Sequence, residues 1–160
     1  MKHGLAAGLA AGLLIAAAGE TPAKTATICG QKVDYTVQPP GPDVPAALRA
    51  FSGVWVGDAG SVVEVYDGRF CVGLIVEQVN PDGTVAAKYV WGDKVKLHLG
   101  LNYDIKPGVV DWPGKIAGGA LVLQTPDRAY SYELRVAGRD ELKGRRVGPD
   151  GRNVVALKRG

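Results

Sequence analysis

Few side chains in this chain could do acid–base or nucleophilic chemistry. The sequence has 160 residues and two histidines, and only His98 lies outside the N-terminal leader described below. A Ser-His-Asp or Cys-His site would have to be built around this single imidazole. Because the neighbours Lys96, Leu97 and Leu99 form an ordinary strand pattern, we expect no catalytic residue and no enzymatic activity.

Carboxylates are no better placed for catalysis or for metal binding. Most stand singly in predicted turns, where hydrogen bonds from nearby backbone amides explain them. These are Asp67, Asp82, Asp127 and Asp150. Glu64 and Glu77 lie on strands predicted to pair and could form a glycosidase-like pair, but we favour a salt-bridged exposed face. A zinc site needs three or four His, Cys or carboxylate ligands, and since both cysteines are assigned to a disulfide below, we expect no metal and no cofactor.

Aromatic side chains are the remaining candidates for a binding site. Tyr89 and Trp91 alternate in one predicted strand and share a face, as do Tyr130 and Tyr132 in another. A cup lined by such rings is where a β-barrel holds a hydrophobic or aromatic small molecule. The alternative interpretation is that the four rings simply fill the core.

Residues 1–18 have the pattern of a secretory signal peptide. Lys2 and His3 are followed by an uncharged run from Leu5 to Ala18 that ends in small residues. This run is too short to span a membrane as a helix. We therefore expect a protein that is secreted or periplasmic, with no membrane span after the leader is cleaved.

The two cysteines, Cys29 and Cys71, would then lie in an oxidising compartment. An isolated pair in such a compartment is usually joined, so we predict one disulfide. It would close a loop of about 42 residues and stabilise the fold by about 4 kcal/mol through loop entropy. Two unrelated buried thiols are the alternative, and the pair is too far apart in the sequence for a CxxC redox motif.

Composition and charge indicate one turn-rich globular domain. Apolar residues make up 46% and charged residues 22%, while 23 glycines, 10 prolines and few aromatics argue against a helical bundle. The net charge of +3 is too small and too dispersed to predict binding to nucleic acid or to an anionic membrane.

The pattern of elements predicts an all-β fold. Residues 19–45 are expected to form an N-terminal arm with a proline-rich connector, and residues 46–51 a short helical turn. Residues 46–160 are expected to form the domain, an antiparallel meander of eight to nine strands that closes into a lipocalin-like barrel. A β-sandwich is the alternative, and residues 92–119 give no clear pattern. Strands are predicted at 54–57, 61–66, 69–79, 84–91, 120–124, 129–136, 140–147 and 153–159.

Residues 48–57, LRAFSGVWVG, carry a resemblance to known barrels. A helical turn that leads into Gly53-Val54-Trp55 resembles the opening motif of the calycins, the lipocalin-like and avidin-like barrels. The resemblance implies structural roles for Gly53 and Trp55, with the Trp plugging the closed end of the barrel and a late basic residue packing over it. Arg135, Arg146 and Arg159 are the candidates for that basic residue.

The resemblance does not extend to a ligand set. The tryptophans and polar residues of avidin-type sites are not recognisable, so biotin binding is not implied. A looser similarity, to small bacterial exported domains without known activity, covers FxGxWxG from Phe51 to Gly57 and LxVExVxxDGxxxxxYxWG from Leu74 to Gly92.

Three functional hypotheses follow. The first is a non-enzymatic exported barrel that binds a small, mostly apolar or aromatic ligand through Tyr89, Trp91, Tyr130 and Tyr132. The second is a protein-interaction or enzyme-inhibitor domain of the cell envelope that acts through residues 92–119 and the arm, with no small-molecule site. The third, a hydrolase or isomerase, requires a buried carboxylate with a raised pKa inside the barrel.

Overall fold

The computed structural model describes residues 21–61, 69–96, 102–125, 127–149 and 151–160. In these ranges the fold is all-β apart from one helical turn. No described helix has the length and apolar character needed to cross a bilayer. The elements are β1 Lys24–Ile28, β2 Gln31–Tyr35, α1 Ala46–Arg49, β3 Gly53–Ser61, β4 Arg69–Val79, β5 Thr84–Lys96, β6 Asn102–Asp104, β7 Gly108–Asp111, β8 Gly114–Ala117, β9 Ala120–Gln124, β10 Ser131–Gly138, β11 Glu141–Gly148 and β12 Gly151–Arg159.

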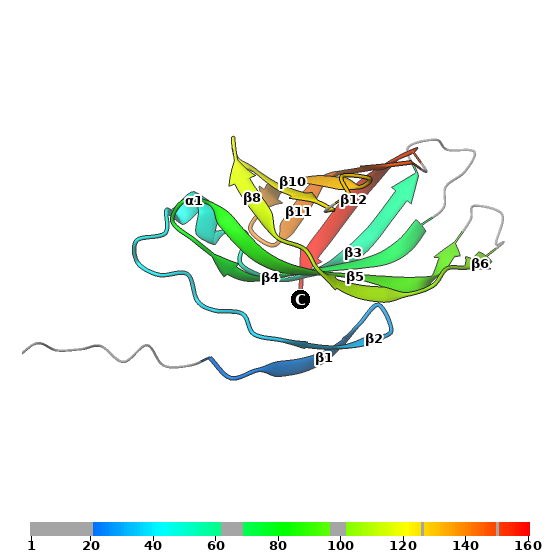
Figure 1. The fold of residues 1–160 in the computed structure, drawn as a ribbon, viewed down its shortest axis with the longest axis horizontal. Helices are drawn as coiled ribbons and strands as arrows, with labels where there is room; N and C mark the ends of the chain where they lie inside the picture. Colours follow the sequence, from blue (N-terminus) through cyan, green and yellow to red (C-terminus); the bar gives the residue numbers. More distant parts are fainter. Residues whose placement is uncertain (1–20, 62–68, 97–101, 126, 150) are drawn as a thin grey trace, which may run out of the picture.

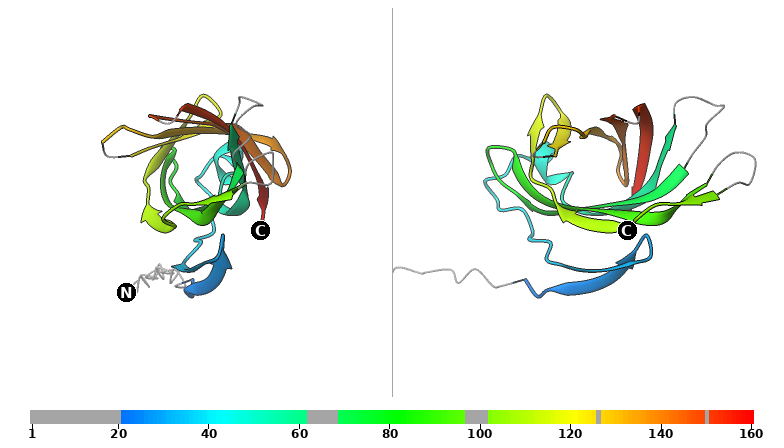
Figure 2. Two further views of the ribbon diagram at one scale, coloured as in Figure 1. Left: turned by 90° about the vertical axis from the view of Figure 1, so that its right-hand side faces the viewer. Right: turned by 45° about the vertical axis from the view of Figure 1, so that its right-hand side comes forward.

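Eight antiparallel strands close into a barrel. Hydrogen-bonded neighbours run β3–β4–β5–β8–β9–β10–β11–β12, and β12 pairs with β3 again. The ribbons of these strands form a ring when the molecule is viewed along the barrel (Figure 2, left). The predicted closed meander is therefore confirmed, and the sandwich alternative is wrong. Closure gives every strand of the ring two partners, so the ring itself has no edge.

Alternation of side chains explains which faces the strands bury. In β10, Tyr132 and Leu134 are at most 2% exposed, whereas Arg135 lies on the outer surface. Buried apolar side chains from all eight ring strands meet inside the barrel in one cluster.

The turn predicted at 80–83 is present, with the amide of Asn80 donating to the Thr84 carbonyl at 2.9 Å and Gly83 at a φ of +85°.

The described residues in 92–119, which have no clear sequence pattern, complete the barrel. Strand β5 continues to Lys96, and its second edge is shared by β8, β7 and β6 along its length. Strand β8 closes the ring through only two residue pairs with β5, Thr84 with Lys115 and Val85 with Gly114. Pro107 and Pro113 interrupt this edge, which is why no continuous strand pattern could be read there.

Strand β3 differs from the prediction of a short strand at 54–57. It runs unbroken through Gly57 and Gly60 to Ser61 and pairs with β4 and β12 along this length. A side chain at Gly57 would run into the carbonyl oxygen of Ala156 on β12. The glycine thus serves close strand packing. Residues 62–68, which hold Glu64 and the predicted Asp67-Gly68 turn, lie outside the described residues, as do the leader (1–18), His98 and Asp150.

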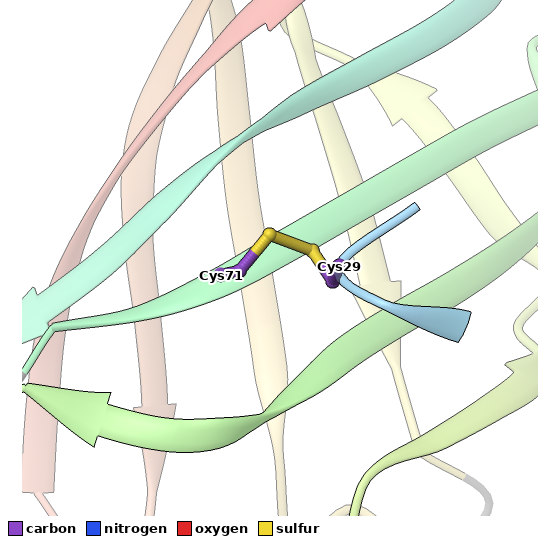
Figure 3. Close-up of a disulfide and its surroundings, with 2 residues drawn as sticks. All are labelled: Cys29 and Cys71. Atoms are coloured by element: carbon purple, nitrogen blue, oxygen red, sulfur yellow. A yellow bond between two sulfur atoms is a disulfide. The ribbon is translucent and has the colours of Figure 1, made fainter. Parts of the chain in front are cut away.

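The N-terminal arm contains a hairpin of its own. Strands β1 and β2 pair only with each other and lie outside the barrel (Figure 1). Cys29 and Gly30 form the two-residue turn, with φ of 50° and 78°, the left-handed values that such a turn requires. The predicted disulfide is present and joins this turn to Cys71 on β4, with a Cα–Cα distance of 5.4 Å (Figure 3).

A second, smaller apolar cluster lies between the hairpin and the outer face of the barrel. Ile28 and Val33 of the hairpin pack against Ile75 of β4 and Val90 of β5, and all four are at most 4% exposed. Gly73 leaves room for this contact, since a side chain there would run into Ile28. The outer face of β4 and β5 is therefore shaped to receive the hairpin.

Candidate functional site

One end of the barrel is closed by Trp55. Its side chain is fully buried, and its Nε1 donates to the carbonyl oxygen of Phe51 at 2.9 Å. The guanidinium of Arg159 lies 4.0 Å from the centroid of the indole ring. Arg159 also donates to the carbonyl oxygens of Ser52 at 2.9 Å and Ala50 at 3.1 Å. Of the three basic residues considered from the sequence, Arg159 is the one that covers Trp55.

Gly53 makes this arrangement possible. It begins β3 with a φ of +122°, which a side chain would strain, and a Cβ there would lie 2.8 Å from the Arg159 guanidinium. Helix α1 lies at the same end, whereas β6 lies at the opposite end (Figure 1). At the closed end, both the Trp55 indole N–H and the Arg159 guanidinium are therefore hydrogen-bonded to backbone carbonyl oxygens.

Aromatic side chains gather inside the barrel. The ring centroids of Tyr89 and Tyr132 are 4.9 Å apart, and Trp112 packs edge-on against both, at 4.9 Å and 5.2 Å. Trp91 stacks on Tyr89 at 5.7 Å. The hydroxyls of Tyr89 and Tyr132 hydrogen-bond to each other. Of the four residues predicted to line a site, Tyr89 therefore contacts two others, Trp91 of β5 and Tyr132 of β10.

Trp112 is the member of this cluster that sequence reasoning missed. It lies between β7 and β8, and its backbone amide donates to the Ala87 carbonyl at 2.6 Å. Its side chain is 3% exposed, and its Nε1 has no hydrogen-bond acceptor among the described residues. A buried N–H left in this state costs about 1–3 kcal/mol. The neighbours Asp111 and Pro113 give no alternating pattern from which an inward Trp could be predicted.

Tyr130, the fourth predicted residue, packs against a buried arginine instead of the other rings. The Arg146 guanidinium lies 4.5 Å from the Tyr130 centroid and 5.9 Å from that of Phe70. Arg146 is only 9% exposed, and its register partner is Tyr132. With the amide of Asn153 oriented to satisfy both of its groups, its oxygen accepts from Arg146 Nη1 at 2.7 Å. A cation inside the barrel was not expected from the sequence.

The strand register places these residues toward the end of the barrel away from α1. Trp55 begins the inward row of β3, whereas Phe70 pairs with Ala59 further along the strand, and Trp91 pairs with Val72. Phe70, Trp91 and Tyr130 are only partly buried. The indole of Trp91 donates to the Lys106 carbonyl at 2.7 Å, which fixes its ring. The two ends therefore differ, with a fully buried plug at one and partly exposed rings at the other.

The carboxylates of the described residues all reach solvent. None of them is buried, and Arg146 is the only buried charged group in these ranges. A hydrogen bond from the Thr84 hydroxyl lowers the pKa of Asp82, and one from Thr125 lowers the pKa of Asp127. The guanidinium of Arg145 lowers the pKa of Glu133, with a smaller effect from Arg135.

Glu77 lies on the outer surface as well. Its carboxylate is 3.8 Å from Lys88 Nζ and accepts a hydrogen bond from the backbone amide of Thr36 at 3.0 Å. This agrees with the salt-bridged face that we favoured for this residue, while its proposed partner Glu64 lies outside the described residues. In the same ranges, no group of three or more His, Cys, Asp and Glu side chains is arranged to hold a metal ion.

Comparison with known proteins adds little to this geometry. No family model matches the chain, and no curated protein matches it. Among solved structures, the chain is similar to a de novo designed fluorescence-activating β-barrel, with 16% sequence identity and a TM-score of 0.48. The match covers 73% of this chain and 100% of the designed one.

Proposed function

We propose that this protein is an exported, calycin-like barrel that binds a small, mostly apolar or aromatic molecule and has no enzymatic activity. The observation that carries the proposal is the aromatic lining at the end of the barrel away from α1. There Phe70, Trp91 and Tyr130 remain partly exposed beside fully buried rings. Aromatic side chains that stay partly exposed at a barrel mouth offer stacking surfaces to a ligand.

The contrast between the ends of the barrel supports this location. Trp55, Arg159 and α1 close one end with bonded polar groups, so a ligand has no entry there. At the other end, each ring that a flat ligand stacks against contributes about 0.5–1.5 kcal/mol beyond the apolar area buried. Binding also costs less conformational entropy when the rings are already held in place, as Trp91 is by its hydrogen bond to the Lys106 carbonyl.

Export is supported by the leader pattern of residues 1–18 and by the disulfide. A bond between Cys29 and Cys71 persists in an oxidising compartment, such as the periplasm or the extracellular space. The opening Gly53-Val54-Trp55 motif with Arg159 over the indole supports the calycin-like assignment.

The carboxylates support a binding role in preference to an enzymatic one. A general acid needs a pKa raised by burial or by a like charge. Where the pKa of a described carboxylate is shifted, as for Asp82, Asp127 and Glu133, hydrogen-bond donors lower it. These groups remain ionised and face solvent.

A protein-interaction domain is the second candidate function. The observation that favours it is the dense filling near the plug, where Trp55, Leu74, Leu134, Leu142 and Leu157 are at most 1% exposed. A barrel filled along its whole length would act only through its outer surface. The two candidates differ in whether the aromatic end accepts a small molecule.

Dye binding tests the proposal. We expect 1-anilinonaphthalene-8-sulfonate to gain fluorescence with the folded protein, and Trp91→Ala to weaken its binding by about tenfold, which corresponds to about 1.4 kcal/mol. Val122→Ala is the matched control, because Val122 is 40% exposed in β9 and lies on the opposite face of its strand from the buried Leu121 and Leu123. Equal dye binding by both variants, or none by the wild type, would favour the protein-interaction alternative.

A further inference from the structure

The three tryptophans differ in how their indole N–H groups are bonded. Trp55 donates to Phe51 and Trp91 donates to Lys106, both to backbone carbonyl oxygens. Trp112 Nε1 is the one buried side-chain nitrogen or oxygen in the described ranges that has no hydrogen-bond partner. Folded proteins bond nearly all such buried groups, so an exception needs a specific explanation.

The surroundings of this N–H are aromatic and inside the barrel. The indole is 3% exposed and packs edge-on against Tyr89 and Tyr132, at interplanar angles of 63° and 73°. The hydroxyls of these two tyrosines are hydrogen-bonded to each other. Trp112 therefore places one unbonded donor among aromatic rings, and a single polar group in an apolar site is what fixes the orientation of a ligand.

We propose that the molecule bound by the barrel is a flat aromatic compound that carries a neutral hydrogen-bond acceptor, and that Trp112 Nε1 donates to this acceptor. A carbonyl oxygen or a ring nitrogen has the required chemistry. This inference rests on the proposed function and specifies the ligand class for the same site. Trp112 becomes the residue that selects for the acceptor, while the tyrosine and tryptophan rings bind the aromatic body.

A neutral acceptor fits this position better than an ionised one. A buried anion requires several donors or a paired cation, and a single indole N–H supplies one neutral hydrogen bond. The positive charge of the interior belongs to Arg146, whose guanidinium packs on the rings of Tyr130 and Phe70. An anionic ligand would therefore depend on Arg146, and the two cases can be separated by experiment.

Quinoline and naphthalene form the deciding pair of probes. They have the same shape and differ by one ring nitrogen, which is the acceptor. We expect the wild type to bind quinoline about three- to tenfold more tightly than naphthalene, as one added hydrogen bond provides. Trp112→Phe should abolish this preference. Trp55→Phe is the matched control and should keep it, because that indole N–H is bonded at the closed end.

A second measurement covers the case in which Trp112→Phe folds poorly. In a ¹H–¹⁵N spectrum of the wild type, quinoline should move the Trp112 indole N–H resonance downfield, and naphthalene should not. Equal affinity for the two probes, with no such shift, would overturn the inference and leave the proposed function standing. Tighter binding of 2-naphthoate than of quinoline would overturn it in favour of an anion held by Arg146. If no probe binds, the inference and the proposed function both fail.

Discussion

The protein buries apolar surface in two places by different means. Inside the barrel, a ring of eight hydrogen-bonded strands encloses a large cluster that contains no disulfide. Outside it, Ile28, Val33, Ile75 and Val90 form a small cluster under a two-stranded hairpin tied down by one disulfide. A two-stranded hairpin is marginal in water by itself. The inner cluster therefore defines the fold, while the outer cluster depends on a local attachment.

Removing the plug of the inner cluster should have the largest effect. Trp55→Ala deletes a fully buried indole, leaves the Phe51 carbonyl without the indole N–H and removes the ring that lies under the Arg159 guanidinium. We expect the free energy of unfolding to fall by about 3–5 kcal/mol. Urea denaturation measures this change, and a loss below about 1 kcal/mol would show that Trp55 does not hold the closed end together.

Breaking the disulfide should have the next largest effect, confined mainly to the outer cluster. The double variant Cys29→Ser, Cys71→Ser should lose about 2–4 kcal/mol of stability. Backbone amides of β1 and β2 should then exchange with deuterium before those of β10, because the barrel keeps its own hydrogen bonds. Hairpin amides that stay as protected as those of the barrel would contradict the independence of the two regions.

A smaller effect is expected from crowding the contact between hairpin and barrel. Gly73→Ala places a methyl group against the side chain of Ile28 and should cost about 1–3 kcal/mol. Gly138→Ala is the matched control in β10, because nothing lies within 4 Å of the added carbon. Thermal denaturation compares the two variants. Equal melting temperatures would show that the hairpin does not sit as closely on β4 as described.

The smallest effect should come from the charged outer surface. Arg145 and Arg135 lower the pKa of Glu133, so this carboxylate stabilises the fold when it is ionised. That contribution is present above the ordinary glutamate pKa of about 4.5 and is lost as the pH falls through the lower folded value. Glu133→Gln should therefore make the melting temperature fall less steeply as the pH is lowered. At pH 7 the melting temperature should fall only by the small amount expected for the loss of a surface ion pair. An unaltered pH dependence of the melting temperature would contradict this role.

Local patterns in the sequence predicted much of the fold. Alternation identified the strands that carry Tyr89 and Tyr132, and the cysteine count identified the Cys29–Cys71 bond. The closed end at Trp55 was implied by the resemblance of the opening motif to that of the calycins. The strands and the disulfide depend on neighbouring residues or on residue type alone, so they could be predicted without knowledge of the fold.

The features that were missed depend on long-range register. Trp112 points inward because β7 pairs with β5, and Arg146 points inward because β11 follows the register of β10 and β12. Neither residue has a distinctive local pattern. The β1–β2 hairpin was also not predicted, since its turn uses Cys29-Gly30 in place of the usual Asn-Gly or Asp-Gly pair.

The position of the binding site can be tested by mapping where a small aromatic molecule binds. The measurement is a titration of the ¹⁵N-labelled wild type with 1-anilinonaphthalene-8-sulfonate, followed by the amide and indole resonances. We predict that the largest shifts occur at Phe70, Trp91, Tyr130 and Arg146, at the barrel end away from α1. Shifts concentrated on the hairpin and the outer faces of Ile75 and Val90, or no shifts at saturating dye, would contradict it.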